Sequence, residues 1–153
     1  MQLILFEPEI PQNSGTLIRM CTCFNITLGI IEPAAFLFSD RKFKRAGMDY
    51  VDLKKIRHYS SFKEMKIINR NKRIILLDTK ATTKYYDIQY KNSDIIMAGK
   101  ESTGVPEDVY NKSDLIVHIP MINGARSLNL AISAAIVVSE AQRQLGYSAI
   151  HHI

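Results

Sequence analysis

Residues 94–106 read Asp-Ile-Ile-Met-Ala-Gly-Lys-Glu-Ser-Thr-Gly-Val-Pro. The run from Asp94 to Gly99 is almost wholly apolar, which is typical of a strand buried on both faces, and a polar loop follows it at once. Similar apolar runs recur along the chain, each closed by residues that end a strand. They occupy residues 2–6, 27–31, 73–78 and 115–119, with a more polar candidate at 53–59.

Helical signals fill most of the intervals between these runs. Asn13 or Ser14 is expected to cap the first helix, and Ser127 the last and longest one. The stretch 79–93 is mixed in character and is expected to be loop, with at most a weak strand near Ile88. The expected helices cover about 13–25, 40–47, 60–68, 106–110 and 127–145. Strands that alternate with helices predict an α/β fold, namely one domain over 1–153 with a mostly parallel sheet and helices on both faces.

Composition excludes several classes of protein. The chain has 153 residues, of which 46% are hydrophobic and 23% charged, so it is neither disordered nor collagen-like. Cys21 and Cys23 are its only cysteines and are too close together to close a useful disulfide loop. No targeting segment or membrane span is visible, since the longest apolar stretch is interrupted by Asn129 and Ser133. The expectation is a soluble, cytoplasmic protein without membrane contact.

The basic residues are concentrated in one window. Residues 41–73 hold twelve of the 20 Lys and Arg side chains and three of the 15 Asp and Glu side chains. The window therefore carries +9, and the remainder of the chain carries −4 of the net +5. A confined basic field indicates a surface for a polyanion, although solvated faces of amphipathic helices give the same pattern.

Three loops are expected at the carboxyl ends of strands, where parallel sheets bind ligands: 7–13, 99–105 and 120–127. The loop between Gly99 and Gly104 lacks the Lys-Ser/Thr that a P-loop requires, and no Gly-x-Gly-x-x-Gly opens the first helix. Standard nucleotide-phosphate binding is therefore disfavoured. The two glycines allow close approach to a ligand beside Glu101, while a tight turn with a solvated Glu is the alternative.

Single residues in these regions have two interpretations each. Arg19 is a surface arginine or a contact for an anion near the first loop. Asn129 begins an apolar helix and is expected to fix a loop or a ligand, because a buried amide must be paired. Cys21 and Cys23 fit core packing better than metal binding, since no second pair of ligands exists. No metal site is predicted.

Taken together, the loops match a known set of motifs in order and spacing. The first is Glu-Pro-Glu-Ile-Pro-Gln-Asn-Ser-Gly at 7–15 with Arg19, and the second is Ala-Gly-Lys-Glu-Ser-Thr-Gly-Val-Pro at 98–106. The third is Ile-Pro-Met at 119–121 with Arg-Ser-Leu-Asn-Leu at 126–130. They resemble the three motifs of the SPOUT RNA 2′-O-methyltransferases. The segment 40–50 also resembles the signature of the single-domain, YibK-like subgroup that acts on the tRNA wobble position.

This resemblance implies properties that the residue patterns alone do not. It implies a C-terminal trefoil knot that binds S-adenosylmethionine, and a homodimer. The cofactor would be held mostly by backbone groups and by apolar contact with adenine. The implied cofactor residues are Leu77, Gly99, Ile119, Ser127 and Leu128.

The implied catalytic group is Arg19, reaching toward the partner's cofactor, and the residues that orient the loops are Asn13, Glu101 and Asn129. Ser139 departs from relatives that carry Tyr there. From the basic window, the residues expected to grip the anticodon stem-loop are Arg41, Lys42, Lys44 and Arg45.

The expected activity is transfer of a methyl group from S-adenosylmethionine to the ribose 2′-hydroxyl of the wobble nucleotide, a cytidine or modified uridine, in the tRNA anticodon loop. Two alternatives share the scaffold: a non-catalytic RNA-binding module, and 2′-O-methylation of another RNA. A third, flavodoxin-like binding of a small molecule, is weakened by the missing phosphate loop.

Overall fold

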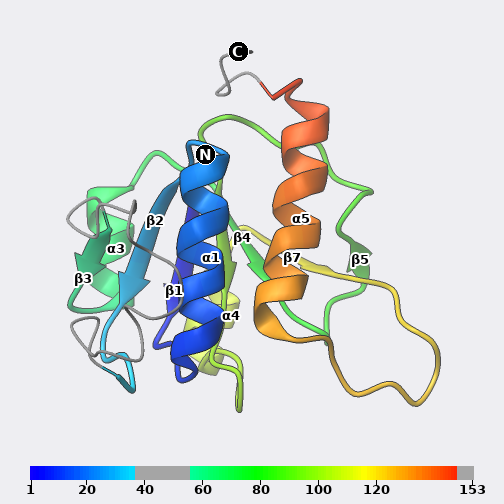
Figure 1. Ribbon diagram of the computed structural model, residues 1–153, viewed down its shortest axis with the longest axis horizontal. Helices are drawn as coiled ribbons and strands as arrows, with labels where there is room; N and C mark the ends of the chain where they lie inside the picture. Colours follow the sequence, from blue (N-terminus) through cyan, green and yellow to red (C-terminus); the bar gives the residue numbers. More distant parts are fainter. Residues whose placement is uncertain (37–55, 148–153) are drawn as a thin grey trace.

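The computed structural model describes residues 1–36 and 56–147 (Figure 1). These residues form a seven-stranded sheet in the order β3-β2-β1-β6-β4-β7-β5. Every strand pairing in it is parallel, which confirms the predicted sheet type. The strands are β1 (Gln2–Phe6), β2 (Thr27–Ile31), β3 (Arg57–Tyr59), β4 (Ile74–Leu77), β5 (Thr83–Lys84), β6 (Ile95–Ala98) and β7 (Leu115–His118).

Helices cover both faces of the sheet, as predicted. Helices α1 (Pro11–Cys23) and α5 (Leu130–Gln144) lie side by side on one face (Figure 1). Helices α3 (Phe62–Ile68) and α4 (Glu107–Asn111) pack on the other. In the described ranges, no helix has both the length and the apolar character that crossing a membrane requires.

The alternation of side chains along β1 explains how one strand supports both layers. Leu3 and Leu5 belong to the cluster that packs under α1 and α5. Ile4 and Phe6 belong to the cluster on the α3 and α4 side. Successive strand residues point to opposite faces, so a strand buried on both faces must be apolar throughout. All of β1 is indeed buried.

The strand order brings distant loops together. The chain builds β1, β2 and β3 toward one edge of the sheet, and then places β4, β6 and β7 on the other side of β1. Ligands of open parallel sheets bind at the carboxyl ends of the strands where the order reverses. The loops that follow β1, β6, β4 and β7 therefore meet at the end of the sheet where the carboxyl ends of these strands lie.

Three sequence-based boundaries differ from the structure. Helix α1 begins at Pro11 with Ile10 at the N-cap, not at Asn13 or Ser14, because proline suits the first helical turn. Helix α5 begins at Leu130 with Asn129, not Ser127, as its N-cap. The weak strand lies at Thr83–Lys84 instead of near Ile88. The expected helix at 40–47 lies outside the described residues.

Candidate active site

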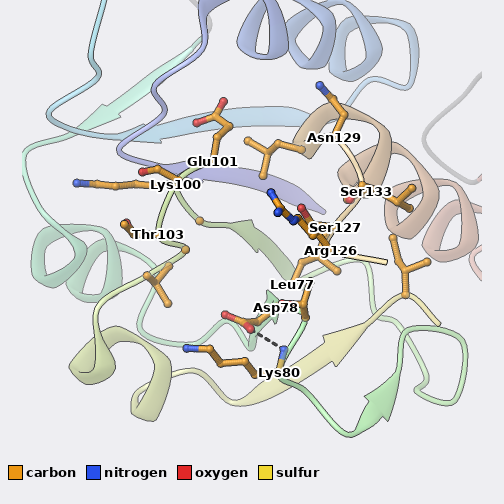
Figure 2. A pocket seen from close by; sticks show the side chains of 18 of the residues that line it. Leu77, Asp78, Lys80, Lys100, Glu101, Thr103, Arg126, Ser127, Asn129 and Ser133 are labelled. Atoms are coloured by element: carbon orange, nitrogen blue, oxygen red, sulfur yellow. Dashed lines mark hydrogen bonds between the residues drawn. The ribbon is translucent and has the colours of Figure 1, made fainter. Parts of the chain in front are cut away.

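The converging loops enclose a pocket of about 1030 Å³ at the carboxyl edge of the sheet (Figure 2). Its walls come from the ends of β4, β6 and β7, from α4 and from the start of α5. A volume at the upper end of the usual range for ligand pockets, about 300–1,000 Å³, is large enough for a nucleoside-sized cofactor.

Three polar side chains, from the first turn of α1, the loop after β6 and the N-cap of α5, form one hydrogen-bonded network at the pocket. The Asn13 Nδ2 donates to Glu101 Oε1 at 3.0 Å. The Asn129 Nδ2 donates to Asn13 Oδ1 at 2.9 Å. Asn129 Oδ1 also accepts from the backbone N–H groups of Ala131 and Ile132, so the same amide caps α5. The predicted loop-orienting residues thus lie together, and they tie α1, the loop after β6 and α5 to one another.

The carboxylate of Glu101 has its acceptor sites well occupied. Its Oε2 accepts from the backbone N–H of Glu9 at 2.8 Å, and Oε1 accepts from Asn13 and from the backbone N–H of Ile10. Two backbone groups and one amide therefore hold it in one orientation. Such a carboxylate is suited to holding the first loop in place, because its lone pairs are committed to fixed donors.

Two further contacts join the loop after β1 to the loop after β6. Glu9 accepts hydrogen bonds from the backbone N–H and the hydroxyl of Ser102, at 2.9 and 2.8 Å. The Ser102 hydroxyl and then its N–H hold the pKa of Glu9 below its ordinary value. Lys100 forms an ion pair with Glu7 at 2.6 Å, and that hydrogen bond raises the pKa of the lysine. Residues 100–102 are thus fastened to residues 7–10 at three consecutive positions.

The loop itself closes through its two glycines. Lys100 and Gly104 exchange backbone hydrogen bonds of 2.8 and 3.0 Å. A Cβ on Gly99 would lie 2.6 Å from the carbonyl carbon of Gly104, and Gly104 has φ +72°, a conformation that favours glycine. The backbones of Gly99 and Gly104 therefore approach each other more closely than a side chain on Gly99 would permit.

All the residues predicted for the cofactor line this pocket. Leu77 ends β4, Gly99 follows β6 and Ile119 follows β7, so each comes from a different strand end. Ser127 and Leu128 come from the loop before α5, and both are exposed toward solvent. Ser127 is thus free of the capping role that the sequence assigned to it.

The other predicted residues lie elsewhere. Arg19 is on the exposed side of α1 and is not part of the pocket wall. Ser139 is exposed on α5. The predicted RNA-binding residues Arg41, Lys42, Lys44 and Arg45 lie outside the described residues.

The pocket wall also contains polar residues that the sequence did not assign to the site: Asp78, Lys80 and Ser133, together with Arg126, which stands in the third motif without a predicted role. Figure 2 shows Asp78 and Lys80 on the side opposite Glu101 and Asn129. The signal for Asp78 was present, because it follows a buried strand directly and ligand sites gather at strand ends. Lys80 and Ser133 had no comparable signal.

Metal binding has no support in the described part of the chain, where no group of three or more His, Cys, Asp or Glu side chains is arranged to hold an ion. Cys21 is buried, and burial raises the pKa of its thiol to about 12, while Cys23 is exposed. A thiol that stays protonated is a poor metal ligand, so Cys21 acts as a core residue.

Comparison with known proteins gives a consistent result. The model of the SpoU rRNA Methylase family matches residues 1–139. A tRNA (cytidine(34)-2'-O)-methyltransferase of Beijerinckia indica subsp. indica is 46% identical over 146 residues, which cover 94% of this chain and 91% of the relative. The enzyme of the same name from Escherichia coli K12 is 34% identical over 149 residues, covering 96% and 95% of the two chains.

Solved structures agree with this assignment. One described as "Structural insights into the 2-OH methylation of C/U34 on tRNA" has a TM-score of 0.88 at 34% identity and covers 95% of both chains. The SpoU methyltransferase AviRb of Streptomyces viridochromogenes, solved with AdoMet, has a TM-score of 0.82 at 20% identity, covers 95% of this chain and 57% of that one, and supports the fold alone. With a family model that spans most of its length and relatives aligned from end to end, this chain belongs to the SpoU rRNA Methylase family.

Proposed function

We propose that this protein transfers a methyl group from S-adenosylmethionine to the ribose 2′-hydroxyl of the wobble nucleotide, a cytidine or modified uridine, in the tRNA anticodon loop. One observation carries the proposal. The residues predicted for the cofactor line a single pocket, and the Asn13–Glu101–Asn129 network borders it. Relatives aligned over nearly the whole chain bear the name of this activity.

The pocket fits an adenosyl cofactor. Leu77, Ile119 and Leu128 supply apolar surface for a purine, and Gly99 and Gly104 line the same pocket without a side chain over their backbone groups. Polar groups at the pocket wall supply partners for a sugar and an amino-acid end. When bound, S-adenosylmethionine supplies an activated methyl group on a sulfonium, so the protein must mainly align the reactants.

Arg19 is proposed to act on the RNA side of the reaction. A guanidinium holds its proton above about pH 12 and is therefore unsuited to be a general base. It is well suited to bind the adjacent phosphate and to stabilise negative charge that develops on the attacking ribose oxygen. Asn13, Glu101 and Asn129 position the loops that border the pocket.

A homodimer brings Arg19 to a pocket. Arg19 lies on the exposed side of α1, outside the pocket of its own chain. Helices α1 and α5 lie side by side, and α5 exposes Ile132 to 53%. We propose that these outward faces pair with a second copy, so that Arg19 of one protomer reaches the pocket of its partner. Closed two-fold pairing is the commonest form of oligomer.

The family resemblance adds a trefoil knot in the C-terminal part. Composition favours a cytoplasmic location, and the basic window of the sequence adds RNA contacts at Arg41, Lys42, Lys44 and Arg45. Within the described part of the basic window, Arg57, Lys63 and Arg70 are exposed. These cations extend the proposed RNA surface along the same window, because neutralising phosphates dominates the affinity for nucleic acid.

The test combines calorimetry with single-turnover kinetics. The folded protein should bind S-adenosylmethionine and transfer its methyl group to tRNA. Arg19→Ala should bind the cofactor as the wild type does but transfer the methyl slowly at saturating tRNA. Lys112→Ala, whose ammonium group pairs with Asp108 on the other face of the sheet, should react normally. Tight tRNA binding without cofactor binding would favour the non-catalytic RNA-binding module. An unchanged rate for Arg19→Ala would refute its catalytic role.

A further inference from the structure

Asp78 is a carboxylate in the pocket wall that the proposed reaction leaves without a task. It follows β4, which lies between β6 and β7 in the sheet, so it is placed where the two other cofactor loops converge. Figure 2 shows it across the pocket from Glu101 and Asn129. It is therefore separate from the network that fastens the loops.

One oxygen of Asp78 has a structural role and the other does not. Oδ1 accepts from the backbone N–H of Lys80 at 2.8 Å, which closes a local turn after the strand. Within residues 1–36 and 56–147, Oδ2 has no hydrogen bond or ion pair that engages it. It lies 3.5 Å from the position that a Cβ on Gly104 would occupy, so it is close to the glycine loop, and both residues line the pocket.

The neighbours of Asp78 indicate which part of the cofactor it meets. Leu77, the preceding residue, is half-buried and supplies apolar surface at the end of β4. When a purine rests on Leu77, the ribose bonded to it is within reach of Asp78, which lines the same pocket. The amino-acid end lies several bonds farther away. A carboxylate is an acceptor only, and a ribose offers two hydroxyl donors.

We propose that Asp78 Oδ2 accepts hydrogen bonds from the ribose hydroxyls of the adenosyl cofactor and so selects a ribonucleoside over its deoxy form. This inference rests on the proposed function, because it assumes that the pocket holds S-adenosylmethionine. Hydrogen bonds to a charged acceptor are stronger than neutral ones, and their loss leaves a desolvated carboxylate facing the ligand. Asp78 thereby sets both the affinity for the cofactor and the orientation of its sugar.

The test measures binding of S-adenosylhomocysteine and its 2′,3′-dideoxy analogue by calorimetry. Asp78→Asn keeps an oxygen for the Lys80 turn and removes the charged acceptor, whereas Asp78→Ala removes both. Asp108→Asn, on α4 and paired with Lys112, is the matched control. Both Asp78 variants should bind S-adenosylhomocysteine about 10- to 100-fold more weakly than wild type, and the control should bind as wild type does.

The analogue separates the ribose from other partners. Wild type should bind the dideoxy analogue about as weakly as Asp78→Asn binds S-adenosylhomocysteine. The affinity of Asp78→Asn for the dideoxy analogue should be only slightly lower than its affinity for S-adenosylhomocysteine. If Asp78→Asn weakened the binding of S-adenosylhomocysteine and of the dideoxy analogue by the same factor, the proposal would be overturned. Asp78→Asn binding like wild type while Asp78→Ala fails would also overturn it, since Asp78 would then serve the turn alone.

A third ligand distinguishes the sugar from the amino-acid end. Methylthioadenosine has the ribose but no ammonium group, so Asp78→Asn should weaken its binding by the same factor. A variant that binds it as wild type does would assign Asp78 to the ammonium and refute the sugar contact. Failure of wild type to bind any of these ligands would instead refute the proposed function itself.

Discussion

Asn129 performs two tasks with one amide, and substitutions can separate them. Its Oδ1 caps α5 through the N–H groups of Ala131 and Ile132, and its Nδ2 donates to Asn13. Asn129→Ala removes both functions. Asn129→Ser restores an oxygen that can cap the helix but has no donor placed to reach Asn13.

The magnitudes follow from these contacts. Loss of an N-cap costs about 1 kcal/mol, and loss of one part-buried hydrogen bond about 1 kcal/mol more. Asn129→Ala should thus lower the free energy of unfolding by about 2 kcal/mol, which corresponds to a fall in Tm of about 4–8 °C for a chain of this size. Asn129→Ser should lose about half of that. Urea unfolding, with unchanged m-values, and thermal scans measure both.

The two variants should differ in stability but should have similar rates of methyl transfer. The Asn13 link is absent from both, so methyl transfer should slow about tenfold or more in each, because misplacement by about 1 Å costs up to about 100-fold. Their similar rates and different stabilities are the signature of one residue with two separable tasks. Equal stabilities would refute the capping role, and wild-type activity in Asn129→Ser would refute the positioning role.

Three further outcomes test other parts of the site. Gly99→Ala should abolish binding of S-adenosylhomocysteine in calorimetry, because its Cβ would lie 2.6 Å from the Gly104 backbone. Gly146→Ala also strains its backbone, at φ +62°, but it lies past the far end of α5 with nothing within 4 Å of its Cβ, and it should bind the ligand normally. The pKa of Glu9 is lowered in the folded state, so its stabilising effect is present above its ordinary value of 4.5 and is lost as the pH falls through the folded value. Glu9→Gln should therefore unfold more easily than wild type at pH 7, and the difference should shrink as the pH falls below 4.5; a difference in stability that is independent of pH would contradict the Ser102 contact. Neutralising Arg41, Lys42, Lys44 and Arg45 together should weaken tRNA binding and reduce its salt slope by about 3, with unchanged affinity for S-adenosylhomocysteine; an unchanged slope would move the RNA surface elsewhere.

The central architecture was predictable because its signals are local and strong. The run Ile95–Ala98 has no polar residue, so only a strand buried on both faces accommodates it. The convergence of Asn13, Glu101 and Asn129 followed from where parallel strands end, together with the family motifs. Helix boundaries were less accessible, since both Ser127 and Asn129 are good N-caps and only the tertiary contact with Asn13 selects one.

Other features had no signal in a single sequence. Strand β5 has two exposed residues, Thr83 and Lys84, and forms through its pairing with β7. The contact between Glu9 and Ser102 joins residues 93 positions apart and depends on the sheet order. Asp78 did have a signal in the sequence. Ligands bind at the carboxyl ends of parallel strands, and the loop after β4, which begins with Asp78, meets this criterion as well as the three loops that were selected.

The most direct test of the central claim locates the transferred methyl group. Purified protein, S-adenosylmethionine and tRNA are incubated, and the RNA is digested and mapped by mass spectrometry. The proposed reaction places one methyl group on the ribose of the wobble nucleotide, and none on a tRNA carrying a 2′-deoxynucleotide there. A methyl group on a base, on another nucleotide, or on the 2′-deoxy substrate would contradict it, as would the absence of any transfer by a folded protein that binds the cofactor.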